Sequence, residues 1–283
     1  MSKIFTRTFR VRWGELDPSG TVSPANYLRY LVETAWDWGV AAGMDVNYSR
    51  NPDVFWVIRE TEIHFLRPLQ HDDVFDFTIW MVNWQRVRGT RCFELTRKNN
   101  GEVIAQGTQH IVYMDAKTGR PTNLPEEEIE KFRLDDPRVF PFERFPKIAA
   151  FENSFVTQRQ VEWMDLDSYE HVNNVIYVNY AEEAAVRDFA ARGWSPVKLT
   201  EAGLSVVTRR VHVQYLSIAE WGETLNISTH MLHVNDMGGS RYVGITRADG
   251  SSVAECILDW ELVDRKTGQA RSLPDELHGR FQD

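Results

Sequence analysis

Two aspartates at equivalent positions of a duplicated segment have the chemistry to act on a carbonyl compound. Asp17 lies in segment 11–35, and Asp167 lies in segment 161–185, which repeats the first one 150 positions later with nine of twenty-five residues identical. A carboxylate can serve as a general base or as a nucleophile. Each aspartate precedes an expected helix by about one turn of chain, and the free N–H groups of that helix can polarise a carbonyl oxygen. The duplication therefore indicates two related candidate sites.

The second copy carries more polar residues than the first. It has His171 and Asn174 where the first copy has threonine and proline. His171 lies four residues after Asp167 and could position water or orient that carboxylate. Asn173 or Asn174 is most simply the N-cap of the helix, which would still serve a site by fixing the helix end. We expect the main site in the second half.

Each candidate also has a structural interpretation. An aspartate in a loop before a helix is often a turn or capping residue, and a shared turn would explain why both halves keep it. His171 could be a solvated loop histidine. Three further equivalent pairs are expected to be structural. They are the helical Glu33 and Glu183, solvated or ion-paired; Glu15 and Asp165, partners of nearby backbone or arginine; and Trp13 and Trp163, in the core.

The elements that must position these residues follow one order in both halves: a strand, an irregular loop, a long helix and four strands. Helical spacing of apolar residues predicts helices from Ser23-Pro24 to about Ala42, stopped by Gly43, and from Asn173-Asn174 to Gly193. Alternating patterns and turn residues predict strands at 3–13, 54–66, 73–84, 89–98 and 102–115, and at 205–217, 223–235, 240–248 and 252–264. Each helix must bury its apolar stripe against one sheet face.

The period of the repeat is that of a domain. The sequence predicts an N-terminal domain over 1–125, a proline-rich linker over 126–153 and a C-terminal domain over 154–283. Two like domains in one chain are typical of a fused homodimer. We therefore expect a pseudo-dimer within one chain, and further pairing of chains stays open.

Composition excludes several classes of function. A net charge of −9 disfavours nucleic acid as a partner, and 42% hydrophobic residues allow a substantial core. Cys92 and Cys256 lie in strand-like segments and are expected to be buried thiols, without a disulfide. No stretch approaches a transmembrane span or has the spacing of a metal or phosphate site. We expect a soluble, cytoplasmic protein with no metal, no cofactor and no membrane partner.

Two strings resemble those of the hotdog-fold thioesterases. W-G-E-L-D-P-S-G, at 13–20, is similar to the loop of the 4-hydroxybenzoyl-CoA thioesterase type, whose second aspartate is catalytic and matches Asp17. D-L-D-x-x-x-H-V-N-N-V-x-Y, at 165–177, resembles the second of two tandem hotdog domains in plant and bacterial acyl-ACP thioesterases. Its matching residues are Asp167, His171, Asn173 and Asn174.

The resemblance implies an α+β double hotdog fold, in which two antiparallel sheets each wrap around a long central helix and pack as a pseudo-dimer. Two departures separate this chain from the plant enzymes. They have an asparagine at the position of Tyr169 and a carboxylate at the position of Ile218, near which this chain has Glu220. The complete plant-type catalytic set is therefore not present.

Arg86, Arg88 and Arg91 form the densest basic cluster, near the turn between two expected strands. In hotdog thioesterases this region often meets coenzyme A, and such a cluster can clamp a pyrophosphate. A solvated hairpin end is the structural alternative.

These observations together predict a thioesterase that hydrolyses an acyl thioester of CoA or acyl carrier protein. The alternatives are a hotdog hydratase or dehydratase, whose Asn-Pro spacing is missing here, and a non-catalytic binder of acyl thioesters.

Overall fold

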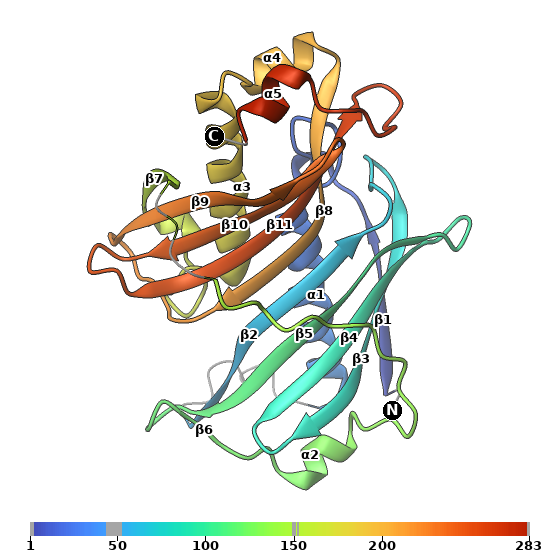
Figure 1. The fold of residues 1–283 in the computed structure, drawn as a ribbon. Helices are drawn as coiled ribbons and strands as arrows, with labels where there is room; N and C mark the ends of the chain where they lie inside the picture. The colour runs from blue at the N-terminus through green and yellow to red at the C-terminus, as the bar shows by residue number, and fades with distance from the viewer. Residues whose placement is uncertain (1–2, 44–52, 149–150, 152, 282–283) are drawn as a thin grey trace. The chain divides into compact units, whose positions relative to one another are not determined.

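The computed structural model describes residues 3–43, 53–148, 151 and 153–281. The chain divides into two compact units, Met1–Arg144 and Phe145–Asp283, and the division falls inside the expected linker segment (Figure 1). The order of strand, loop, long helix and four strands recurs in both units, as predicted.

The first unit is an antiparallel sheet with one long helix. Its strands follow the order β1-β3-β4-β5-β2, and a short strand, β6, pairs with β5. The elements are β1 (Ile4–Arg10), the 3-10 helix η1 (Trp13–Glu15), α1 (Pro24–Ala41), β2 (Val54–Phe65), β3 (Val74–Gln85), β4 (Arg88–Arg97), β5 (Val103–Asp115), β6 (Arg120–Pro121) and α2 (Glu126–Glu130).

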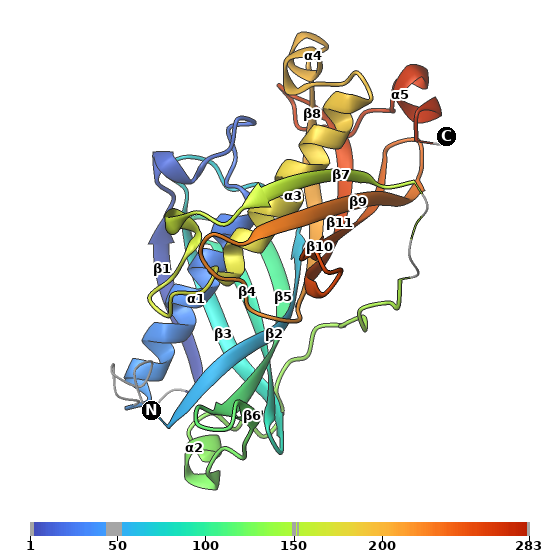
Figure 2. The ribbon, with the colours of Figure 1, turned by 90° about the vertical axis from the view of Figure 1, so that its left-hand side faces the viewer.

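The second unit repeats this plan with strand order β8-β11-β10-β9-β7, and α3 packs against β9 and β7 (Figure 2). The elements are β7 (Phe155–Gln160), the 3-10 helix η3 (Trp163–Asp165), α3 (Asn174–Ala191), α4 (Pro196–Glu201), β8 (Leu204–Tyr215), β9 (Thr224–Val234), β10 (Gly238–Thr246), β11 (Ser252–Asp264) and α5 (Asp275–Gly279).

The predicted ends of both long helices are confirmed. Pro24 takes the first helical position of α1, where its missing N–H costs nothing. Asn173 caps α3 by accepting a hydrogen bond from the Val175 N–H at 3.2 Å. Gly43 and Gly193 follow the helices with φ of +76° and +83°, a left-handed conformation that glycine adopts without strain.

The core of the first unit lies between α1 and one sheet face. Tyr30 of α1 packs on Phe9 and Phe75, with ring centroids 4.9 and 5.0 Å apart, and the rings of Phe77 and Phe93 stack at 5.6 Å. Burying a side chain of this size contributes about 1.5–3 kcal/mol to stability. Cys92 and Cys256 are buried free thiols, as predicted.

Both predicted core tryptophans are instead on the surface. Trp13 and Trp163 are 75% and 73% exposed, and each is the first residue of a 3-10 turn before the long helix. In the first unit the Trp13 ring meets His71 edge-on, with centroids 5.5 Å apart. Their repetition therefore reflects the shared turn and not the core.

Two short helices not foreseen from the sequence close the far end of α3 in the second unit. α4 and α5 contribute to an apolar cluster with the end of α3 and strand β11. Its buried residues are Phe189, Trp194, Leu199, Leu204, Trp260, Leu262, Leu273 and Leu277. Among the described residues, no helix is long and apolar enough to cross a membrane.

Candidate active site

A tight loop presents Asp167 just before α3. The Asp167 N–H donates to the His171 carbonyl oxygen at 2.9 Å, which closes the loop. The Asp167 carboxylate accepts the Tyr169 N–H at 2.9 Å through Oδ1, and Glu170 takes a left-handed φ of +64° to complete the turn. The predicted pair, Asp167 and His171, thus lies at the two ends of one closed turn.

The first unit builds the same loop around Asp17. The Asp17 N–H donates to the Thr21 carbonyl oxygen at 2.8 Å, and Asp17 Oδ1 accepts the Ser19 N–H at 2.7 Å. The Ser19 hydroxyl donates to the same carboxylate oxygen. Both aspartates therefore shape a turn. Oδ1 of Asp17 has an additional hydroxyl donor, whereas within the described ranges Oδ1 of Asp167 accepts from backbone alone.

The start of α3 lies directly after this loop. The Asn173 N–H donates to the Asp165 carbonyl oxygen at 2.9 Å, and its side chain caps the helix. Asn174 begins the helix. Burial raises the pKa of the Tyr215 hydroxyl, and the interaction with the Asn174 side chain lowers it by a smaller amount. The two asparagines thus fix the helix end, where the helix dipole gives partial positive charge.

In each unit a tyrosine of the long helix donates a hydrogen bond to the 3-10 turn that precedes the helix. The Tyr180 hydroxyl donates to Asp165 Oδ2 at 2.7 Å, and the Tyr30 hydroxyl donates to Glu15 Oε2 at 2.6 Å. Burial, followed by the hydrogen bond to Asp165, raises the pKa of Tyr180. The same carboxylate oxygens accept backbone N–H groups at the start of their turns. The predicted structural role of Glu15 and Asp165 is confirmed.

A second loop, residues 217–223 after β8, pairs with the Asp167 loop. The Val172 N–H donates to the Ala219 carbonyl oxygen at 2.9 Å, and a backbone bridge joins His171 to Glu220. The Ala219 N–H donates to the Tyr177 hydroxyl at 3.2 Å, and burial raises the pKa of this hydroxyl to about 12. Glu220 is thereby placed beside His171, which the sequence register alone did not establish.

An arginine holds the second loop in each unit. In the second unit, Arg247 Nε lies 2.6 Å from Glu223 Oε2, and Arg247 Nη1 donates to the Ser217 hydroxyl at 3.0 Å. Arg247 Nη2 also donates to the carbonyl oxygen of Ile218. These bonds tie both ends of the loop to the residue that follows strand β10.

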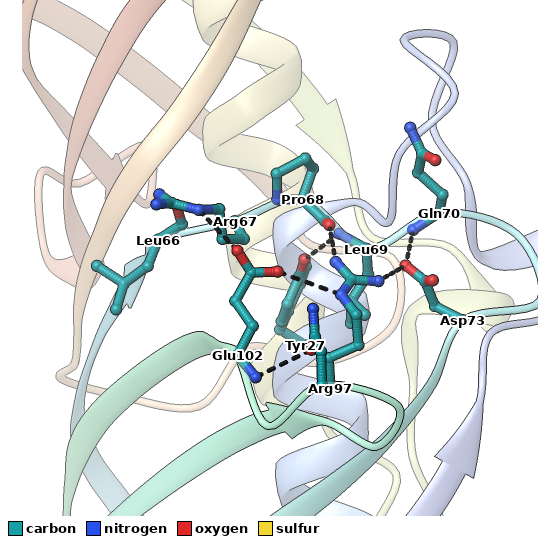
Figure 3. Close-up of polar contacts among 10 residues, drawn as sticks. Tyr27, Leu66, Arg67, Pro68, Leu69, Gln70, Asp73, Arg97 and Glu102 are labelled. Atoms are coloured by element: carbon teal, nitrogen blue, oxygen red, sulfur yellow. Dashed lines mark hydrogen bonds and ion pairs between the residues drawn. The ribbon is translucent and has the colours of Figure 1, made fainter.

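The first unit has the equivalent network around Arg97, shown in Figure 3. Arg97 forms an ion pair with Asp73 and donates to the Pro68 carbonyl oxygen at 3.0 Å. The Leu69 N–H donates to the Tyr27 hydroxyl at 3.1 Å. Sequence reasoning missed these arginines, although each recurs with its acidic partner at the spacing of the repeat.

The loops of the second unit expose large apolar side chains. The exposed rim consists of Trp163, Met164, Tyr169, Ile218 and Trp221. The equivalent positions of the first unit hold Trp13, Gly14, Ser19, Pro68 and His71. The loops of the second unit therefore expose more apolar side chain than the equivalent loops of the first.

The structure does not bring the three predicted arginines together. Arg86 and Arg88 are exposed at the β3–β4 turn, whereas Arg91 lies three residues along β4 from Arg88 and so points to the other sheet face. There its Nε donates to Gln109 Oε1 at 2.8 Å, and burial lowers its pKa to about 10. Arg91 is thus tied into the sheet.

The two helical glutamates take part in ion pairs on the surface of their helices. Glu33 pairs with Arg7 at 3.2 Å and Glu183 pairs with Arg187 at 2.8 Å, so both are ion-paired as predicted. Within the described part of the chain, no group of three or more histidine, cysteine, aspartate or glutamate side chains could hold a metal ion.

Comparison with known proteins relates this geometry to a family. A family model described as the thioesterase-like superfamily matches residues 11–132 and 161–281. The chain is 26% identical over 193 residues to the palmitoyl-acyl carrier protein thioesterase of Cuphea hookeriana, covering 64% of this chain and 46% of that protein. It is 24% identical over 284 residues to an acyl-[acyl-carrier-protein] hydrolase of Cuphea viscosissima, covering 95% and 64% respectively. The chain spans about half the length of most of these curated relatives.

Solved structures share the fold. An acyl-ACP thioesterase from Bacteroides thetaiotaomicron superposes with a TM-score of 0.76 at 18% identity, covering 92% of this chain and all of that one. The 12:0-ACP thioesterase from Umbellularia californica gives a TM-score of 0.76 at 21% identity, covering 93% and 98%. The expected hotdog-type double domain, with its antiparallel strands and few helices, is confirmed. With both repeats matched by the family model, the chain belongs to the thioesterase-like superfamily.

Proposed function

We propose that the protein hydrolyses an acyl thioester of CoA or acyl carrier protein to a free acid and a thiol. The observation that carries the proposal is the capped N-terminus of α3, with the Asp167–His171 turn directly before it, in a chain of the thioesterase-like superfamily. This arrangement combines a carboxylate, an imidazole and the positive end of a helix dipole within one short stretch.

In the proposed reaction, Asp167 is the base or the nucleophile. As a base, it takes a proton from water while the water oxygen bonds to the thioester carbon. The oxyanion is stabilised at the start of α3, where Asn173 and Asn174 fix the helix end. The carbon–sulfur bond then breaks, and the proton passes to the departing sulfur. His171 positions the water in this proposal, and Glu220, which is paired with His171 in a backbone bridge, orients the imidazole.

The second unit holds the main site in this proposal. Its two adjoining loops carry His171 and Glu220 as well as the exposed apolar rim, which would contact the substrate. Asp17 has neither partner, since Thr21 and Gln70 stand at the equivalent positions. Asp17 is therefore proposed as a second or vestigial site.

The proposed substrate carries an anionic carrier group. The names of the relatives above support an acyl-ACP thioester, and an acyl-CoA shares the same reacting group. The charge of the chain is unevenly spread between the units. The first unit has 19 Lys and Arg against 21 Asp and Glu, whereas the second has 13 against 20. We propose that Arg86 and Arg88, in the less acidic unit, contact the phosphates.

We further propose that the two sheets, each wrapped around its long helix, pack as a pseudo-dimer. The domains would be 1–125 and 154–283, joined by the linker 126–153. The repeat of the whole plan, from 3-10 turn to last strand, supports this origin from a fused homodimer. Assembly of chains into a larger homo-oligomer stays a prediction.

Release of free thiol from acyl-CoAs of varied chain length tests the function. Thiol release at a rate proportional to enzyme supports the hydrolase. A change in enoyl thioester absorbance without thiol release would favour the hydratase or dehydratase. Binding of acyl thioesters without either reaction would leave a non-catalytic binder.

A further inference from the structure

Arg241 lies wholly inside the second unit, on β10. Its Nη1 donates to Asp188 Oδ2 of α3 and to the Thr229 hydroxyl, both at 2.8 Å. Its Nε and Nη2 atoms are also buried, and neither has a hydrogen-bond acceptor among the described residues. Because buried N–H groups are almost always paired, a charged side chain with two unpaired nitrogens indicates a group that the chain itself does not supply.

The surroundings of Arg241 are rich in donors. Arg241 Cζ lies 5.5 Å from the ring centroid of Phe189, and the ring of Trp260 lies 5.1 Å from the same centroid. The buried Trp260 Nε1 likewise has no acceptor within the described ranges. The Thr229 hydroxyl accepts from Arg241 and donates to the Tyr242 carbonyl oxygen, so it offers no further acceptor to the guanidinium.

Positive charge also exceeds negative charge here. Asp188 Oδ1 accepts from Arg192 Nε at 3.0 Å, so one buried carboxylate serves two guanidinium groups. The equivalent position of the first unit shows a satisfied arginine, because Arg91 bonds to Gln109 through Nε and Nη2. The excess of positive charge is thus a property of the second unit and not of the repeated fold.

We propose that this place binds the carboxylate of an amphipathic acid. The free Nε and Nη2 of Arg241 form the planar fork that matches two carboxylate oxygens. The adjoining apolar cluster, with Phe189, Leu262 and Leu277, suits the alkyl or aryl part of the same molecule. The pair of Arg241 and Asp188 thereby becomes an anchor for a ligand.

This site lies far along α3 from the Asp167 loop. Asp188 follows Asn174 by fourteen residues of one helix, a rise of about 20 Å along its axis. The carboxylate has two chemical sources that fit. It can belong to a free fatty acid, or to the far end of an acyl chain whose thioester lies at the start of α3. The second source rests on the proposed function, whereas the first does not.

Direct binding to the full chain tests the proposal without any turnover. Decanoate and decanol serve as probes that differ in charge, and affinities follow from the ligand-dependent rise in Tm. We expect decanoate to bind about 10-fold more tightly than decanol, as a charged hydrogen bond would give. Arg241→Met should abolish this preference, and Arg91→Met, at the equivalent position, should keep it. Equal binding of the two probes, or an unchanged preference in Arg241→Met, would overturn the site.

Asp188→Asn provides an independent variant if Arg241→Met does not fold. Loss of the competing carboxylate leaves Arg241 without its counter-charge, so decanoate should bind more tightly to this variant. Decanoate should therefore raise the Tm of Asp188→Asn by more than it raises the Tm of the unaltered protein. Unchanged or weaker binding in this variant would also overturn the site. Octadecanoyl-CoA and its ω-carboxyl analogue, whose extended chains are long enough to span the distance from Asn174 to Asp188, then separate the sources. A lower KM for the analogue that Arg241→Met removes assigns the carboxylate to the substrate, and equal KM values assign it to a free acid.

Discussion

Tyr180 and Asp165 join the middle of α3 to the turn that precedes it, through a 2.7 Å hydrogen bond from the tyrosine hydroxyl to the carboxylate. The Asp165 carbonyl oxygen in turn accepts the N–H of Asn173, the residue that caps the helix. The helix therefore fixes the loop that carries Asp167. Tyr30 and Glu15 make the same connection in the first unit at 2.6 Å.

Removing this hydroxyl should loosen the Asp167 loop. Tyr180→Phe leaves a buried carboxylate short of one donor, and we expect a loss of about 1–3 kcal/mol in the free energy of unfolding. Turnover should fall as well, since the aspartate and the helix end lose their fixed geometry. Urea unfolding and the kcat for thiol release measure the two effects.

Tyr30→Phe is the matched control in the first unit. It removes an equivalent hydrogen bond and should cost similar stability, but it should leave most of the turnover. Equal losses of kcat in the two variants would contradict the assignment of the main site to the second unit.

The arginine that holds the second loop gives another paired prediction. Arg247→Ala removes the ion pair with Glu223 and the bonds to Ser217 and Ile218, so the loop that pairs with His171 should move. We expect kcat to fall and hydrogen exchange of the Ala219 amide to quicken. Arg97→Ala should quicken exchange at Leu69 and change kcat little. Slow exchange at Ala219 in the first variant would show that the loop does not depend on Arg247.

The proposed contact with the phosphates of the carrier group predicts different effects for replacing Arg88 and Arg91. Arg88→Ala should raise the KM for acyl-CoA and leave kcat nearly unchanged, because a phosphate contact is common to ground and transition states. The effect should shrink as salt rises, since exposed charges are screened. Arg91→Ala should instead lower stability by removing its bonds to Gln109. An unaltered KM in Arg88→Ala at low salt would make a carrier-protein substrate the better proposal.

The helices, strands and the order of both units could be predicted from the sequence, because apolar spacing, glycine and proline report local backbone preferences. The start of α3 at Asn174 is one such case. Trp13 and Trp163 show where prediction from the sequence fails. Their repetition indicated a shared role, but whether a turn directs a side chain inward depends on tertiary packing that no local pattern contains.

The candidate site was predictable only where its residues are close in sequence. Asp167 and His171 belong to one turn, so their spacing was informative. Glu220 lies in the loop after β8 and Arg247 directly follows β10, so both reach these loops from segments distant in sequence, and their placement depends on how the strands pair. Arg91 failed as a member of the basic cluster because the alternation of a strand sends it to the opposite face from Arg88.

The pseudo-dimer proposal predicts the behaviour of a fragment. A chain ending at Arg144 contains the complete first unit but lacks its proposed partner. We expect it to self-associate or precipitate when expressed alone, because the partner surface would be exposed to water. Size-exclusion chromatography with light scattering checks this. A soluble, folded monomer would speak against the pseudo-dimer.

Turnover of the Asp167→Asn variant is the most direct test of the central proposal. Asparagine preserves the size of the side chain and can still accept the Tyr169 N–H, so the fold should survive. Single-turnover and steady-state thiol release should fall by roughly 10²–10⁴-fold, while Asp17→Asn keeps most of its rate. Near-normal thiol release by a folded Asp167→Asn protein would contradict the account, and a comparable loss in Asp17→Asn would move the site to the first unit or to both.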